Sequence, residues 1–81
     1  MRILFFAHLK NIVGQSELDI ELALDQPLKA DDLWQRLIAL HPELSRCRTS
    51  VRIARNGEYA DHHTTFTNTD EVALIPPVSG G

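Results

Sequence analysis

The sequence predicts an α+β domain, in which a mixed sheet of four to five strands packs on one main helix. Apolar runs near both ends, residues 2–7 and 72–75, are typical of buried strands. Residues 17–22 alternate strictly between polar and apolar side chains, which is typical of a half-buried strand. One longer segment, residues 30–40, has the apolar spacing of a helix.

Length and composition fit one small globular domain over residues 1–81. Hydrophobic residues make up 43% and charged residues 23% of the chain, so disorder is not indicated. The net charge of -3 gives no support for a nucleic-acid partner. No apolar stretch is long enough to span a membrane, there is no signal-peptide pattern, and the single cysteine, Cys47, cannot form an internal disulfide. We therefore expect a soluble cytoplasmic protein.

The first strand, residues 2–7, places the adjacent Phe5 and Phe6 on opposite faces, as suits a central strand with apolar side chains on both sides. Residues 8–13 are expected to form a short helix that Gly14 ends. The alternating strand then returns antiparallel. Its three core-facing side chains are expected to be Leu18, Ile20 and Leu22.

The main helix, residues 30–40, carries an apolar stripe made of Leu33, Trp34, Leu37, Ile38 and Leu40. A capping side chain is missing because Lys29 stands at the N-cap, and a missing cap costs about 1 kcal/mol. Asp31 and Asp32 in the first turn are expected to offset part of this cost through the helix dipole. Pro42 ends the helix, and residues 45–50 are expected to be irregular.

The second half of the chain is expected to add a hairpin and a last strand. Residues 51–54 and 58–60 form its two strands, joined by Asn56-Gly57, the preferred pair for a type I′ turn. Phe66 is expected to be an isolated core anchor. In the turn that precedes the last strand, we expect Asn68 to have a positive φ.

The chain's most distinctive stretch is residues 70–81, a strand followed by Pro76-Pro77 and the small-residue tail Val78-Ser79-Gly80-Gly81. The prolines lack an N–H, so they end the strand and stiffen the exit. The last four residues reach roughly 13–14 Å when extended. A Gly-Gly tail can enter a narrow channel, where its terminal carboxylate is the only chemistry it offers. A frayed end without a role is the alternative, and the stiff exit favours a working tail over residues 76–81.

The run Asp-Glu-Val-Ala-Leu-Ile-Pro-Pro-Val-Ser-Gly-Gly resembles the C-terminal signature of the molybdopterin synthase small subunits, a family of ubiquitin-like sulfur carriers. The opening Ile3-Leu4-Phe5-Phe6-Ala7, followed by Leu9 and Val13-Gly14, resembles the first strand and short helix of the same family. The resemblance implies the β-grasp fold of ubiquitin, and it covers the whole chain. Two departures are Lys29, where the family commonly has threonine, and Thr69, where it usually has glycine.

The same resemblance implies how the tail works. A ubiquitin-activating-like adenylyltransferase would consume ATP and Mg²⁺ to adenylate Gly81, and a sulfur donor protein would convert it to a thiocarboxylate. The tail (Gly80, Ser79 and Val78, aimed by Pro77 and Pro76) would then enter the large catalytic subunit of molybdopterin synthase. There the sulfur passes to cyclic pyranopterin monophosphate, in a heterotetramer of two small and two large subunits. The chain itself would bind no cofactor or metal and contribute no catalytic group apart from Gly81.

Three other functions remain open at this stage. The chain could carry sulfur for another route, such as thiamine synthesis or tRNA thiolation. It could be a ubiquitin-like modifier joined to lysines through Gly81, or a small interaction module with an idle tail. The Pro-Pro-Val-Ser-Gly-Gly tail argues against the first of these, because the thiamine-pathway carriers usually lack the Pro-Pro.

A partner-docking face is expected because a single helix covers only one face of the sheet. The central strands carry apolar side chains on both faces, so one apolar patch is left open, and such patches usually mark protein interfaces. We expect this face to hold Phe6, Tyr59 and Ile75. The alternative is that loops cover the patch.

Other chemistry-bearing residues give weaker predictions. The histidines (His8, His41, His62 and His63) lack zinc-site spacing with Cys or carboxylates, so solvated histidines are favoured over a metal site. Cys47 between two arginines is interpreted as a structural cysteine. Four arginines fall within ten positions, namely Arg46, Arg48, Arg52 and Arg55. A solvated face and a docking surface for an acidic partner are equally supported for them.

Overall fold

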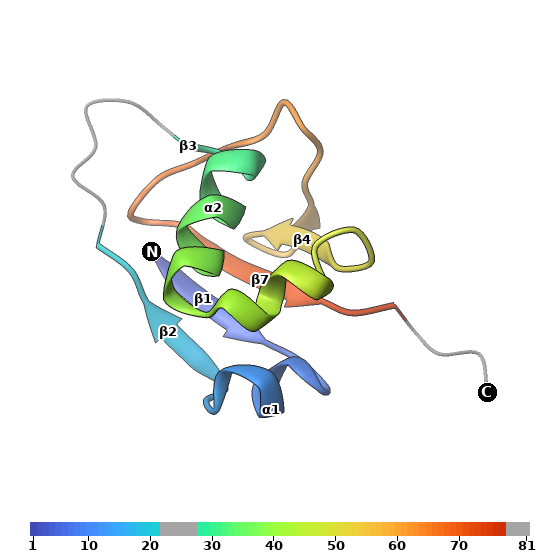
Figure 1. Cartoon of the computed structure of the whole chain (residues 1–81). Helices are drawn as coiled ribbons and strands as arrows, with labels where there is room; N and C mark the ends of the chain where they lie inside the picture. The colour runs from blue at the N-terminus through green and yellow to red at the C-terminus, as the bar shows by residue number, and fades with distance from the viewer. Residues whose placement is uncertain (22–27, 78–81) are drawn as a thin grey trace.

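A five-stranded mixed sheet forms one layer of the protein, and helices cover one of its faces (Figure 1). The computed structural model describes residues 1–21 and 28–77. The strand order is β2-β1-β7-β4-β5. These strands are β1 (Arg2–Phe5), β2 (Glu17–Asp19), β4 (Arg52–Arg55), β5 (Glu58–Tyr59) and β7 (Glu71–Ile75). β1 and β7 run parallel at the centre, and the other neighbours pair antiparallel. The predicted mixed sheet, with its first and last strands adjacent, is confirmed.

The main helix, α2 (Ala30–Leu40), has the predicted bounds and packs across the sheet. Leu33, Trp34 and Leu37 are buried, and Ile38 is half-buried. The prediction for Leu40 was wrong, because this side chain is 56% exposed. α2 ends at Leu40 and the following backbone leaves helical geometry, so no further turn of helix packs over this side chain.

The N-terminus of α2 lacks a side-chain cap, as predicted. The Lys29 ammonium has no acceptor to offer the first N–H groups of the helix, and Lys29 makes no side-chain cap hydrogen bond. The carboxylate of Asp32 instead accepts the Lys29 backbone N–H at 3.4 Å. Asp31 accepts a hydrogen bond from Arg48 at 2.7 Å. Both first-turn aspartates therefore have defined partners in addition to the helix dipole.

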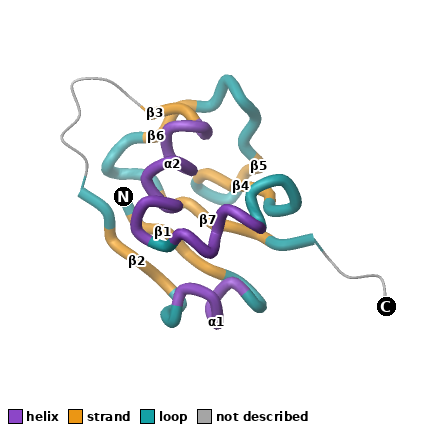
Figure 2. Tube along the Cα trace, viewed as in Figure 1, coloured by secondary structure: helices purple, strands orange, loops and turns teal. Residues whose placement is uncertain are grey.

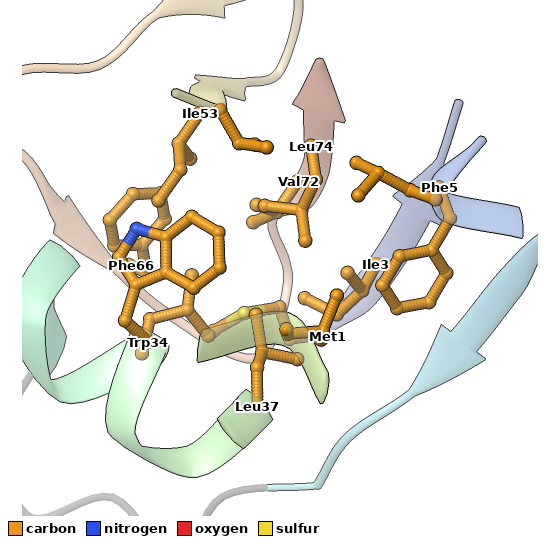
Figure 3. Close-up of a cluster of buried hydrophobic side chains, with 13 residues drawn as sticks. Met1, Ile3, Phe5, Trp34, Leu37, Ile53, Phe66, Val72 and Leu74 are labelled. Atoms are coloured by element: carbon orange, nitrogen blue, oxygen red, sulfur yellow. The ribbon is translucent and has the colours of Figure 1, made fainter. Parts of the chain in front are cut away.

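The hydrophobic core lies between the inner face of the sheet and α2 (Figure 3). Alternate residues of β1 and β7 point into it, because side chains on a strand alternate between the two faces. The short helix α1 (Leu9–Val13) adds the buried Leu9, and Gly14 ends this helix with φ 84°. The largest fully buried side chains are Phe5, Phe66, Ile3, Leu9, Leu33, Leu37, Leu44, Leu74 and Val72.

Backbone φ angles confirm the predicted turn between β4 and β5 but not the predicted turn before β7. Asn56 and Gly57 have φ 51° and 88°, so both central residues of the β4–β5 turn have the sign that a type I′ turn requires. Among the described residues other than glycine, only Ala7 and Asn56 have a positive φ, so the prediction for Asn68 was wrong. The turn before β7 is closed instead by Asp70, whose backbone N–H donates to the carbonyl of Thr67 at 3.1 Å.

Three short elements, two strands and a 3₁₀ helix, were not predicted from the sequence. Strands β3 (Leu28–Lys29) and β6 (Thr65–Phe66) pair antiparallel beside the start of α2 (Figure 2). A 3₁₀ helix, η1 (Pro42–Arg46), follows α2 and buries Leu44. Phe66 is fully buried, so its predicted role as an anchor is confirmed, and β6 holds it in place.

Parts of two predictions lie outside the described residues. They are the core-facing position of Leu22 and the tail Val78-Ser79-Gly80-Gly81. Within the described ranges, no helix combines the length and apolar character needed to cross a membrane.

Candidate docking face and tail exit

The chain leaves the sheet from its central position. β7 lies between β1 and β4, and it ends at Ile75. Pro76 is buried and Pro77 is exposed, so the exit begins against the body of the domain and then leads away from it (Figure 1). Proline fixes φ near −65°, so the backbone at Pro76 and Pro77 is restrained.

Strand register brings the predicted docking residues to one face. Phe5 pairs with Leu74 on the inner face, so the next residues along each strand, Phe6 and Ile75, lie side by side on the outer face. On the other side of β7, Arg52 pairs with Ile75. Across the hairpin, Tyr59 pairs with Ala54 on this same outer face.

The outer face remains open to solvent. Phe6 is 44% and Tyr59 64% exposed, whereas Ile75 is half-buried. In the part of the chain that the structure describes, the only other large exposed hydrophobic side chain is Leu40, on the helix side. No described loop therefore covers this apolar face. The strand register puts Phe6, Ile75 and Tyr59 on this one face, and docking of a partner there stays a prediction. We refer to Phe6, Tyr59 and Ile75 as the docking face.

Two hollows flank the docking face. One has a volume of about 230 Å³, and its lining residues are Arg2, Leu4, Phe5, Phe6, Lys10, Ser16 and Glu17. The other, of about 450 Å³, lies beside the tail exit. Its lining residues are Thr49, Ser50, Val51, Arg52, Tyr59, Ile75, Pro76 and Pro77. The outer face thus combines apolar side chains with recesses on both sides, a shape that fits protruding side chains of another protein.

A hydrogen-bonded network fixes the hairpin that carries Tyr59. Asn56 exchanges two hydrogen bonds with the backbone of Glu71, at 2.8 and 2.9 Å. The Asn56 side-chain amide also donates to Asp70 at 2.9 Å, and the backbone N–H of Thr67 donates to the other Asp70 oxygen at 2.8 Å. Burial alone would raise the pKa of Asp70, but the hydrogen bonds from Thr67 and Asn56 outweigh it and lower the pKa from its ordinary value of 3.8. Asn56 therefore both forms the turn and attaches the hairpin to the start of β7.

The four clustered arginines do not form one surface. Arg48 pairs with Asp31 near the start of α2, and Arg55 donates to the Thr65 carbonyl at 2.6 Å. Arg46 is exposed on η1. Arg52 alone lies on the outer face, with its guanidinium 4.8 Å from the centre of the Tyr59 ring.

The histidines and the cysteine do not come together in the structure. His62 and His63 contact each other, with ring centres 3.9 Å apart, in an exposed turn. Cys47 is half-buried, carries a free thiol and packs against the core. Across residues 1–21 and 28–77, no group of three or more His, Cys, Asp and Glu side chains could hold a metal ion.

A five-stranded mixed sheet over one main helix, with the chain leaving from the central strand, defines a ubiquitin-like β-grasp domain. Comparison with family models matches residues 3–81 to the ThiS family. The chain is 35% identical over 82 residues to the molybdopterin synthase sulfur carrier subunit of Dictyostelium discoideum, covering 99% of this chain and 94% of that protein. It is 34% identical to the human protein of the same name, covering 100% and 93% of the two chains.

Among solved structures, SAMP1 (small archaeal modifier protein 1) from Haloferax volcanii superposes with a TM-score of 0.82. The sequences are 31% identical, and the alignment covers 100% of this chain and 98% of SAMP1. The chain described here therefore belongs to the ThiS family, and its predicted resemblance to the molybdopterin synthase sulfur carrier subunits is confirmed.

Proposed function

We propose that this chain is the sulfur carrier subunit of a molybdopterin synthase and that it carries sulfur on Gly81. The observation that carries the proposal is the exit of the chain from the central strand β7 through Pro76 and Pro77, next to an open apolar face. The names of the Dictyostelium and human relatives support it, and the family match extends through Gly81. A rigid exit beside a docking face delivers the tail to one fixed place on a bound partner.

The proposed chemistry begins with activation of the Gly81 carboxylate. One carboxylate oxygen attacks the α-phosphorus of ATP on an adenylating partner, and pyrophosphate leaves. A cysteine persulfide of a donor protein then attacks the acyl carbon through its outer sulfur, and AMP leaves. A second thiol attacks the donor cysteine sulfur of the resulting acyl disulfide, so that the S–S bond breaks, the thiocarboxylate is released and a disulfide remains on the donor. Activation is needed because a carboxylate oxygen is a poor leaving group, and adenylation splits the exchange into two easier steps. ATP and Mg²⁺ belong to the adenylating partner.

The sulfur would then be delivered inside a larger catalytic subunit, to cyclic pyranopterin monophosphate. Because the dithiolene product contains two sulfurs, two tails that carry a thiocarboxylate are consumed for each product. An assembly of two small and two large subunits meets this requirement. Gly80 and Ser79 would keep the tail narrow in the channel, and Phe6, Tyr59 and Ile75 would hold the domain on its partner.

A second candidate, a ubiquitin-like protein modifier, is supported by the similarity to the archaeal modifier SAMP1. Both functions begin with activation of the terminal carboxylate, and they differ in the group that receives it. A lysine amine would give an isopeptide, whereas sulfur gives a thiocarboxylate. A sulfur carrier for thiamine synthesis or tRNA thiolation would use the same first two steps.

The test is the mass of the C-terminal peptide from protein purified with its native terminus, before and after incubation with the adenylating enzyme, ATP, Mg²⁺ and a sulfur source. The expected result is the mass increase of one sulfur-for-oxygen exchange, localised to Gly81. Gly81→Val should remain unmodified. Conjugates that persist on a denaturing gel, without a thiocarboxylate, would favour the modifier function. A chain whose terminal carboxylate stays unmodified in all conditions would contradict both.

Docking is tested separately with Phe6→Asp and Ile75→Asp, measured as affinity for the purified large subunit. Each places a charge in the apolar centre of the face, so binding should fall by at least about tenfold. Leu40→Asp is a matched control, because Leu40 is an exposed leucine on the helix side. As a control, circular dichroism should show that each variant is folded. Equal effects of Leu40→Asp and Phe6→Asp would contradict the proposed face.

A further inference from the structure

Two cationic side chains lie at the tail end of the outer face, one beside each hollow. Arg52 lines the hollow that contains Tyr59, Ile75, Pro76 and Pro77. Lys10 lines the hollow on the other side with Phe6, and the same hollow extends along β1 to Arg2 and Glu17, which pair with each other. The cations therefore flank the apolar docking face from both sides, and Arg52 shares its hollow with Pro76 and Pro77, where the tail leaves the domain.

Neither cation is matched by a carboxylate among the described residues. The described ion pairs join Arg2 to Glu17 and Glu71, and Arg48 to Asp31. The guanidinium carbon of Arg52 instead lies over the Tyr59 ring, 4.8 Å from its centre. The N–H donors of a guanidinium match a carboxylate in a fork geometry.

The opposite end of the outer face has the opposite character. There, Arg2 is held between Glu17 at 2.6 Å and Glu71 at 3.5 Å, and Asp19 lies opposite Arg2 in the strand register. Because that end carries three carboxylates for one arginine, its charge is negative overall. The chain as a whole has a net charge of -3, so the two unpaired cations at the tail end stand out from an acidic protein.

We propose that the partner protein bound at the docking face presents carboxylates on both sides of an apolar recess, one to Arg52 and one to Lys10. The inference rests on the proposed function and identifies the chemistry of the partner's surface. Complementary charge at the rim of an interface speeds association and fixes the orientation of the partners, while the apolar centre supplies most of the affinity. The orientation of this domain on its partner matters, because it determines where the tail enters the partner.

The arrangement also separates partners from non-partners. A surface with basic residues at these two positions would place like charges against Arg52 and Lys10, and like-charge contacts at an interface are strongly unfavourable. At the far end, the acidic Glu17, Asp19 and Glu71 would accept basic residues and reject acidic ones. A partner must therefore match this polarity along the whole face, not only its apolar centre.

The first test uses a carbodiimide, which joins an amine directly to a carboxylate that touches it, on the complex with the purified large subunit. The chain has two lysines, Lys10 and Lys29, and Lys29 lies at the start of α2. We expect peptide mapping to show coupling of the partner to Lys10 and not to Lys29. The variant Arg52→Lys should gain a second coupling site, whereas Arg46→Lys, its matched control on η1, should gain none. Equal coupling of Lys10 and Lys29, or no coupling at residue 52, would overturn the proposal.

The second test measures affinity for the same subunit at low and high salt. Arg52→Glu and Lys10→Glu should each weaken binding by about tenfold at low salt, mainly through slower association, and the difference should shrink at high salt. Arg46→Glu should stay close to the wild type. If Phe6→Asp abolishes binding but both charge reversals leave it unchanged, the docking face is correct and the carboxylate rim is wrong. If the wild type itself does not bind, both the docking face and the rim are contradicted.

Discussion

Substitution of Asp70 by asparagine should destabilise the domain by about 2 kcal/mol at pH 7. The Asp70 carboxylate accepts one hydrogen bond from the Thr67 backbone at 2.8 Å and one from the Asn56 side chain at 2.9 Å. Hydrogen bonds to a charged acceptor contribute about 1.5–3 kcal/mol each. Asparagine keeps one acceptor oxygen and places an NH₂ group against a donor at the other position, so about one such bond is lost.

This loss is large for a chain of 81 residues. Domains of this size have a free energy of unfolding of roughly 4–12 kcal/mol, since stability averages about 0.05–0.15 kcal/mol per residue. A loss of about 2 kcal/mol should lower the melting temperature by about 10 °C, because each kcal/mol corresponds to about 4–8 °C in a domain of 60–100 residues. Thermal and urea unfolding, followed by circular dichroism, measure both quantities.

The pH dependence supplies an independent check with a defined sign. The pKa of Asp70 is lowered in the folded protein from 3.8, so folding favours the ionised carboxylate. Its stabilisation is fully present above the unfolded pKa of 3.8 and is lost as pH falls through the lower folded pKa. The gap in stability between the wild type and Asp70→Asn should therefore be constant near neutral pH and should close as the pH falls below 3.8.

Asp19→Asn serves as the matched control, because Asp19 is an exposed aspartate on the edge strand β2. Its stability should stay within about 0.5 kcal/mol of the wild type, as is usual for surface substitutions. An Asp70→Asn variant as stable as the wild type at neutral pH would refute the reasoning. So would a stability gap that persists unchanged at acid pH, because the charge of Asp70 would then not be its cause.

Substitutions at four further positions test single contributions to stability, each measured by urea unfolding. Lys29→Thr should stabilise the domain by about 1 kcal/mol by capping α2, whereas Lys29→Ala should not. Gly57→Ala should lower the free energy of unfolding by about 1–2 kcal/mol through the φ of 88° alone, since nothing lies within 4 Å of the added Cβ. Asn56→Gly should keep the turn geometry but lose the hydrogen bond to Asp70. Phe66→Ala should cost about 3–5 kcal/mol, because the ring is fully buried. The turn argument is contradicted if Gly57→Ala is as stable as the wild type. The capping argument is contradicted if Lys29→Ala is as stable as Lys29→Thr, and the burial argument if Phe66→Ala loses less than about 1 kcal/mol.

Strong local patterns predicted most of the main sheet and the whole of α2. The helix bounds came from apolar spacing and from Pro42, and the hairpin came from Asn56-Gly57, because few other pairs tolerate positive φ at both positions. The β3–β6 pair was missed because each strand has only two residues, too few to show an alternation. The prediction for the turn before β7 was wrong because the Asp70 carboxylate accepts a hydrogen bond from the Thr67 backbone N–H and closes the turn without a positive φ.

The docking face was predicted from the excess of apolar residues over what one helix can cover, and the register brings Phe6, Tyr59 and Ile75 together. The two hollows and the presence of one cation beside each of them could not be predicted, because they depend on contacts between segments far apart in the chain. Lys10 and Arg52 are 42 positions apart, from 52 minus 10. The arginine-rich segment drew attention to Arg52, but only the strand register distinguishes it from Arg48 and Arg55.

The parallel pairing of β1 with β7 also determines when the exit of the tail becomes ordered. Ile3 pairs with Val72, so the central contact closes a loop of 69 residues, from 72 minus 3. Contacts that close such long loops form late in folding, because the chain loses the conformational entropy of closure before the contact stabilises the fold. During synthesis, β7 is the last described element to leave the ribosome, so the sheet is completed only after every other element is available. A truncated or unfolded chain therefore presents neither the exposed face of Phe6, Tyr59 and Ile75 nor the exit at Pro76 and Pro77.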